Sequence, residues 1–230
     1  MGEAFSLALG LVTGLNPEFL SIVALSLRVS LTATCIAFVL AFPCAVLIAT
    51  RDFPGRGGIL VLVNALQGLP PVVVGLVLYL ILSRSGPLGF LGLLFTPGGM
   101  IAAQTVLVFP LALALQHRVA QGTWNEFGDA LMIDGAGFGV IVRALLGMAR
   151  VPLATIFLTC FGRAIAEVGA IMIVGGNIRG HTRSMTTAIA LETSKGELPL
   201  AMALGMVLVG LTILASLVVL LLARATRDER

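Results

Sequence analysis

Two opposite charges stand four residues apart inside an otherwise apolar stretch, residues 157–177. On a helix, Arg163 and Glu167 are neighbours, because side chains at positions i and i+4 lie on the same face. Two interpretations stay open. The pair is either a structural link to neighbouring helices, or it faces a water-filled path and helps an anion pass or holds a gate shut. Asn177, which ends the stretch, belongs to the same candidate path.

The composition explains why this pair is unusual. Hydrophobic residues make up 58% of the 230 residues and charged residues only 11%. A soluble domain of this size needs about a quarter of charged residues to cover its surface. The apolar residues also come in long runs. We therefore predict an all-α, polytopic membrane protein.

Five segments are long enough to cross a bilayer, since about 20 residues span the hydrocarbon. Residues 1–18 are too short and too broken by Gly and Pro, and we expect an interfacial segment there. The first span is longer than one crossing needs, so Arg28 is expected to snorkel at the membrane edge. The apolar, Gly- and Pro-rich stretch 86–99 is expected to be an interfacial or re-entrant loop. The predicted spans are about 19–50, 59–82, 100–116, 152–176 and 198–223.

The distribution of Lys and Arg predicts the orientation. One set of connections, together with the C-terminal tail 224–230, carries eight of these residues, and the opposite set carries four. The side with eight is expected to be cytoplasmic. This places the N-terminus outside and the C-terminus inside, and it makes 117–151 a long cytoplasmic loop.

Two further groups of residues have types that suit a transport path. Pro70 and Pro71 are expected to kink the second span, either as a static bend or as a hinge that lines the gate. A predicted outer loop carries Arg179, His181 and Arg183, and a basic mouth raises the local concentration of anions. A solvated face, or a dock for an acidic binding protein, explains these three residues equally well.

The cytoplasmic loop has its own helical pattern. Trp124, Phe127 and Leu131 stand three and four residues apart, and the glycine Gly135 interrupts the pattern before a second apolar stretch at 140–148. The helix either lies on the inner membrane surface or docks a soluble cytoplasmic partner.

Several other classes of protein are disfavoured. The chain has no G-x-x-x-x-G-K-S/T phosphate loop, so we do not expect it to hydrolyse ATP. Its three cysteines, Cys35, Cys44 and Cys160, fit neither a disulfide framework nor a metal site. The two histidines fall on opposite predicted sides, which leaves an intramembrane enzyme little to work with. An ATP-independent channel or secondary transporter remains an alternative, although no internal repeat is visible.

The loop resembles the "EAA" loop of ABC importer permeases, with Asp129-Ala130-Leu131 and, at the matching offset, Gly135. The closing Ile-x-Leu-Pro of that motif is degenerate here. Residues 26–57 and 69–89 resemble the first two helices of molybdate, sulfate and tungstate importer permeases. Residues 162–201 look most like the tungstate branch. The resemblance covers nearly the whole chain.

The resemblance implies a type I permease subunit of an ATP-driven oxyanion importer, for tungstate or alternatively for molybdate or sulfate, in a prokaryotic cytoplasmic membrane. It implies a homodimer, a separate ATPase dimer that binds ATP and Mg, and an extracytoplasmic oxyanion-binding protein. No cofactor is expected in this chain and no nucleic-acid partner. Phe127 and Leu131 would be anchors buried in the ATPase. The implied coupling residues are Glu126, Phe127, Asp129, Ala130, Leu131 and Gly135.

Overall fold

The structure is a computed structural model that describes residues 6, 10, 14 and 16–228, with side chains up to residue 221. This part of the chain holds nine α-helices, one short 3₁₀ helix and no strand. The predicted all-helical class is therefore confirmed. The predicted N-terminal segment 1–18, and the side chains of the predicted tail 224–230, lie largely outside the described residues.

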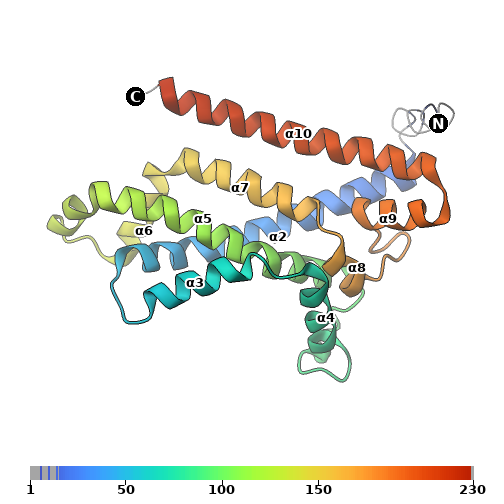
Figure 1. The fold of residues 1–230 in the computed structure, drawn as a ribbon, viewed down its shortest axis with the longest axis horizontal. Helices are drawn as coiled ribbons and strands as arrows, with labels where there is room; N and C mark the ends of the chain where they lie inside the picture. The colour runs from blue at the N-terminus through green and yellow to red at the C-terminus, as the bar shows by residue number, and fades with distance from the viewer. Residues whose placement is uncertain (1–5, 7–9, 11–13, 15, 229–230) are drawn as a thin grey trace.

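Two long helices form the axis of the molecule (Figure 1). These are α2 (Pro17–Thr50) and α5 (Pro97–Ile133), which run about 51 and 55 Å at 1.5 Å per residue. Small side chains at every fourth position of α2 are buried against its neighbours, which lets helix backbones approach closely. This alanine stripe consists of Ala33, Ala37, Ala41, Ala45 and Ala49.

The predicted second span is divided into two helices. α3 (Arg56–Leu66) and α4 (Pro71–Leu82) meet at 100°, and Pro70 and Pro71 lie at the break. Pro71 opens α4, where its missing N–H costs no intrahelical bond. The bend expected at Pro70 and Pro71 is therefore present, but it is a break between two helices and not a kink within one, because the chain between α3 and α4 leaves the helical conformation.

The predicted fourth span is also broken. Its helix α7 (Arg150–Ile165) ends before Glu167, and a short α8 (Gly169–Gly175) follows. On its other side, α7 meets α6 (Phe138–Met148) at 81°. The prediction of one continuous helix over 152–176 is therefore wrong.

The third predicted span continues well beyond residue 116. α5 remains helical to Ile133, so the first half of the expected cytoplasmic loop is an extension of a long helix. Residues 86–96 are a series of turns around the 3₁₀ helix η1 (Gly89–Leu91), as the predicted loop requires, whereas residues 97–99 already belong to α5.

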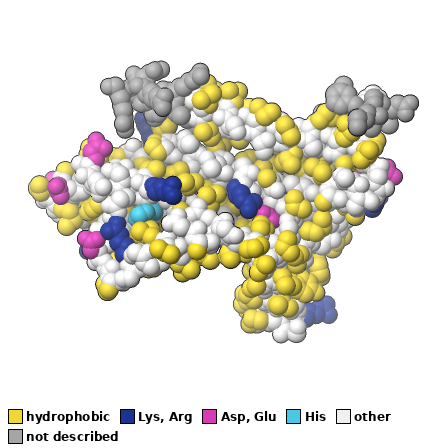
Figure 2. All heavy atoms as spheres, in the orientation of Figure 1, with side chains coloured by type: hydrophobic (Ala, Val, Ile, Leu, Met, Phe, Trp, Pro, Cys, Tyr) yellow, Lys and Arg dark blue, Asp and Glu magenta, His cyan; other side chains and the backbone are white. Residues whose placement is uncertain are grey.

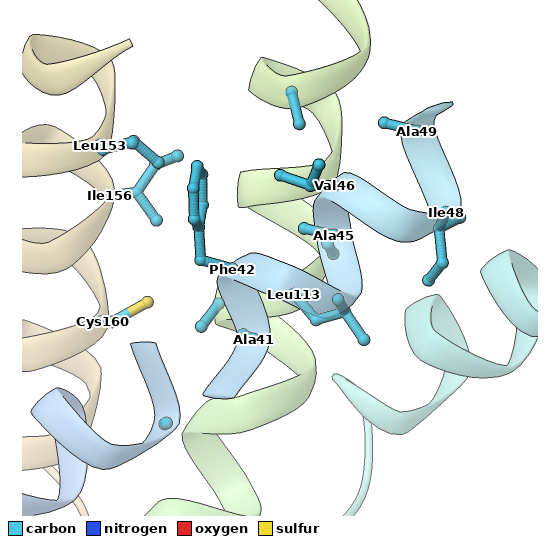
Figure 3. Packing of buried hydrophobic residues seen from close by; sticks show 14 of the residues in the cluster. Ala41, Phe42, Ala45, Val46, Ile48, Ala49, Leu113, Leu153, Ile156 and Cys160 are labelled. Carbon is cyan, nitrogen blue, oxygen red and sulfur yellow. The ribbon is translucent and has the colours of Figure 1, made fainter. Parts of the chain in front are cut away.

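A buried apolar cluster ties α2 to α5 and α7 (Figure 3). The Phe42 ring of α2 stands toward Leu153 and Ile156 of α7, while Ala45 and Val46 lie beside α5. Cys160 is buried in the same cluster, as expected of a cysteine that acts as a small hydrophobe.

The last two helices close the chain. α9 (Met185–Lys195) begins with a capping box between Ser184 and Thr187, and α10 (Leu198–Asp228) packs on α9 and α7. Much of the apolar surface of α10 is exposed, including Val209 and Ile213. Figure 2 shows hydrophobic side chains over α4, whereas acidic and basic side chains gather at the end where α5 and α6 meet.

Length and hydropathy make three of the described helices able to cross a membrane. They are α2, α5 and residues 198–221 of α10. The pairs α3–α4 and α6–α7 pass the same test when each is taken together, which gives up to five crossings. Five crossings therefore stay a prediction.

Candidate functional site

The Arg163–Glu167 pair forms at the break between α7 and α8. Arg163 Nη1 lies 3.1 Å from Glu167 Oε2, and the side chains are 46% and 4% exposed. The pair therefore has one nearly buried carboxylate and one guanidinium that is half open to the surroundings. Contrary to the helical interpretation, Glu167 is not in a helix, because α7 ends at Ile165.

Glu167 holds the broken segment together. Its Oε1 accepts the backbone N–H of Ala170 at 3.1 Å, in the first turn of α8, and its own carbonyl accepts the hydroxyl of Thr186 at 2.7 Å. Gln104 of α5 donates Nε2–H to the carbonyl of Ala164 at 2.8 Å. Backbone groups freed by the break are thus satisfied by side chains from other helices, as burial in a membrane protein requires.

The two breaks in the chain pack against each other. A Cβ added at Gly75 of α4 would lie 2.7 Å from the Cα of Ala170, and one added at Gly169 would lie 2.8 Å from Val72 Cγ2. Val72 directly follows the proline pair. The structure therefore brings the predicted hinge at Pro70 and Pro71 close to the segment that carries Glu167. We call this region the junction: the α3–α4 break, residues 166–169 and the first turns of α4 and α8.

Asn177 lies outside the junction. It adopts φ 50° just after α8, and its Nδ2–H donates to the carbonyl of Thr187 at 3.3 Å. Its Oδ1 is buried and has no partner among the described residues. The residue ties the loop after α8 to α9.

The three cations of the predicted outer mouth have separate surroundings. Arg179 pairs with Glu18, with 2.6 Å between Nε and Oε1, and hydrogen bonding to that carboxylate raises the pKa of the guanidinium. Arg183 pairs with Glu192, with 3.4 Å between Nη1 and Oε1. His181 is exposed and borders a pocket together with Arg183 and with Arg28, which the sequence had placed at a membrane edge.

The end of α5 has the turn that was predicted at Gly135. This glycine has φ 67°, its N–H donates to the carbonyl of Met132, and the N–H of Ala136 donates to the carbonyl of Leu131. These two bonds form a Schellman motif, which ends a helix in this way.

The predicted anchors at this end have different positions. Leu131 is half-buried and packs on the core cluster of its own chain. Phe127 is 38% exposed. Glu126, Asp129 and Ala130 are exposed.

The most exposed apolar side chains at this end were missed by the sequence analysis. Met132 and Ile133 are 62% and 85% exposed, and Val140 and Met148 of α6 are also exposed. We call these four residues the apolar tip. Trp124 and Leu131 pack on the core cluster, whereas Phe127 is exposed, so the predicted stripe marks the inward face only in part. Met132 and Ile133 directly follow its last member.

Among the described residues, no group of three or more His, Cys, Asp or Glu is arranged to hold a metal ion. The site is therefore built from hydrogen bonds, ion pairs and helix breaks.

Comparison with known proteins decides the family. No protein-family profile matches the chain. It is 41% identical over 208 residues to the tungstate uptake system permease protein TupB of Peptoclostridium acidaminophilum, covering 90% of this chain and 91% of that protein. The chain belongs to the permeases of ABC oxyanion uptake systems.

Other members of the family are similar over most of the chain. A probable anion ABC transporter permease of Haloferax volcanii is 40% identical over 86% of this chain and 88% of that protein. The molybdenum transport permease ModB of Escherichia coli is 28% identical over 93% and 97%. These relatives are transport permeases and not enzymes.

Proposed function

We propose that this chain is the permease subunit of an ATP-driven tungstate importer. Its similarity to a tungstate permease over nine-tenths of both chains is the observation that carries this proposal. It would act as a homodimer in a prokaryotic cytoplasmic membrane, with the path near the two-fold axis. An extracytoplasmic binding protein would deliver the anion, and a separate ATPase dimer would bind ATP and Mg.

The apolar tip is the proposed docking surface for the ATPase. Met132 and Ile133 project from the end of α5, and α6 turns sharply away from α7. Large exposed apolar groups on a polar end of a molecule are typical of a surface that a partner covers. Glu126, Asp129 and Ala130 lie beside them and would provide contacts at the rim.

This assignment agrees with the charge distribution. Arg143 and Arg150 lie close in sequence to Met148 of the tip, and Arg118 lies earlier in α5. All three count toward the side that is richer in positive charge. Under the positive-inside rule, the tip would face the cytoplasm.

The junction is the proposed gate region. It combines two helix breaks with an ion pair whose guanidinium is half exposed, and ionisable groups within membrane segments are commonly functional. Arg163 would face the path, while Glu167 would hold the break in place.

The decisive experiment is uptake by proteoliposomes that contain the permease, the ATPase and the binding protein, with tungstate, molybdate and sulfate in competition. We expect vanadate-sensitive uptake of tungstate that molybdate and sulfate inhibit only in large excess. Uptake of molybdate or sulfate that excess tungstate leaves unchanged would identify the substrate as one of those anions. Uptake without ATP would instead support a channel or secondary transporter.

A further inference from the structure

Arg28 is a cation well inside a long apolar helix. It lies eleven residues into α2, about 16 Å from the start of that helix and about 8 Å from its midpoint. Its side chain is exposed, and it makes no ion pair or hydrogen bond with any described residue. A guanidinium without a protein partner needs water or a ligand to solvate its charge, so this face of α2 is expected to meet one of them.

A pocket of about 330 Å³ lies beside Arg28 and is bordered on its other side by a distant part of the chain. The opposite wall comes from the loop after α8, through Gly180, His181 and Arg183. Ser21 and Leu25 of α2 contribute to the lining, and none of the lining residues is acidic. Three groups able to carry positive charge therefore border one cavity.

The charge of Arg183 is only partly balanced. Its partner Glu192 also lies 3.4 Å from Lys195 Nζ, so one carboxylate oxygen serves two cations. The Nε–H of Arg183 is buried and has no acceptor among the described residues. A buried donor without an acceptor is unfavourable unless a ligand or water supplies one.

Two guanidinium groups and an imidazole suit a tetrahedral oxyanion. Guanidinium donors are arranged as a planar fork that binds two oxygens of one anion at once. Metal cations are poor candidates for this pocket, because a cation would meet only like charge. Arg179 is not part of the pocket lining and is already paired with Glu18.

We propose that the pocket between Arg28, His181 and Arg183 is a binding site for the imported oxyanion at the entrance of the path. This inference rests on the proposed function and names a site within it. The phosphate of an anionic lipid offers the same chemistry from another source, so the test must separate the two.

The test uses the complete transporter, with ATPase and binding protein, in phosphatidylcholine proteoliposomes. Tungstate uptake and ATP hydrolysis are measured for Arg28→Gln, Arg28→Lys and His181→Gln. We expect Arg28→Gln to lower uptake at least tenfold while ATP hydrolysis stimulated by the binding protein stays within twofold of wild type. Arg28→Lys should retain an intermediate rate, because it keeps the charge but loses the fork. Arg84→Gln is the matched control, since Arg84 is an exposed cation in the turn after α4 and outside the pocket.

If the wild type takes up tungstate and both Arg28→Gln and His181→Gln take it up at the same rate, the proposed binding site is wrong. The proposed function then still stands. Absence of ATP-dependent uptake by the wild type would overturn both. A defect of Arg28→Gln that occurs only in vesicles containing phosphatidylglycerol would assign the pocket to lipid phosphate and contradict the proposal. Arg28→Gln should elute and melt as wild type does, and a protein that no longer folds would show that Arg28 has a structural role instead.

Discussion

The junction and the apolar tip differ in which of their groups find partners within the chain. At the junction, the chain leaves the helical conformation inside the protein, and Glu167, Gln104 and Thr186 satisfy the freed backbone groups. At the tip, the helix end is already satisfied by its own Schellman bonds, yet Met132 and Ile133 stand exposed. Internal hydrogen bonds to the freed backbone groups stabilise the two breaks of the junction. A region with unsatisfied apolar surface is built for a partner.

The largest effect is expected at the close contact between α4 and α8 in the junction. Gly75→Leu would drive a side chain into the backbone of Ala170, and overpacking of this kind costs about 3 kcal/mol or more when backbone must move. We expect a large loss of folded permease, measured by size-exclusion chromatography and thermal unfolding. Gly57→Leu is the control, because nothing lies within 4 Å of an added Cβ there. A stable Gly75→Leu protein would show that α4 and α8 are not packed this tightly.

The second prediction concerns the carboxylate that organises the junction. Glu167→Ala removes the partner of Arg163 and the acceptor for the Ala170 N–H, and we expect it to destabilise the protein by about 2–3 kcal/mol. Glu167→Gln retains an oxygen acceptor and should cost less. Unfolding midpoints of the two variants are compared. If Glu167→Gln leaves assembly and uptake at wild-type levels, the carboxylate charge has no part in gating.

The tip should respond in the opposite way. Ile133→Asp places a charge at the most exposed apolar position and should lower the amount of copurified ATPase at least roughly tenfold, which corresponds to about 1.4 kcal/mol. The unfolding midpoint of the permease alone should hardly change, because surface substitutions usually cost less than about 0.5 kcal/mol. Thr193→Asp, at an exposed position of α9, is the matched control. Unchanged ATPase association would contradict docking at the tip.

The smallest effect is expected for the exposed ion pair. Arg179→Gln breaks the contact with Glu18, but Arg179 is 71% exposed, and exposed pairs contribute about 0–1 kcal/mol. The unfolding midpoint should shift little, and the shift should become smaller as the salt concentration rises. If Arg179→Gln lowered the unfolding midpoint as much as Glu167→Ala does, the exposure of an ion pair would not determine its contribution to stability here.

The sequence was sufficient for the features that depend on local pattern. Composition predicted the helical class, the apolar runs predicted where the long helices lie, and Gly135 predicted the end of α5. The association of Arg163 with Glu167 was also predicted, although for a helical reason that does not hold.

The remaining features depend on contacts between distant residues. The residues near position 166 do not predict a helix break. The break is stabilised by Gln104 and Thr186, which belong to other helices. The position of Arg28 beside His181 and Arg183 depends in the same way on the folding of the loop after α8. Periodicity was a poor guide to the tip, because it identifies the side of a helix that the protein itself covers.

The length of α5 has a mechanical consequence. Gln104 contacts the junction near one end of this helix and Ile133 stands at the other, about 44 Å away at 1.5 Å per residue. One helix, with Pro110 inside it, therefore joins the junction to the tip where the ATPase would bind. A tilt of about 5° around Gln104 would move Ile133 by roughly 4 Å over that length. A small displacement at the junction and a larger displacement at the tip would then belong to the same tilt of α5. Their ratio would depend on where the helix pivots.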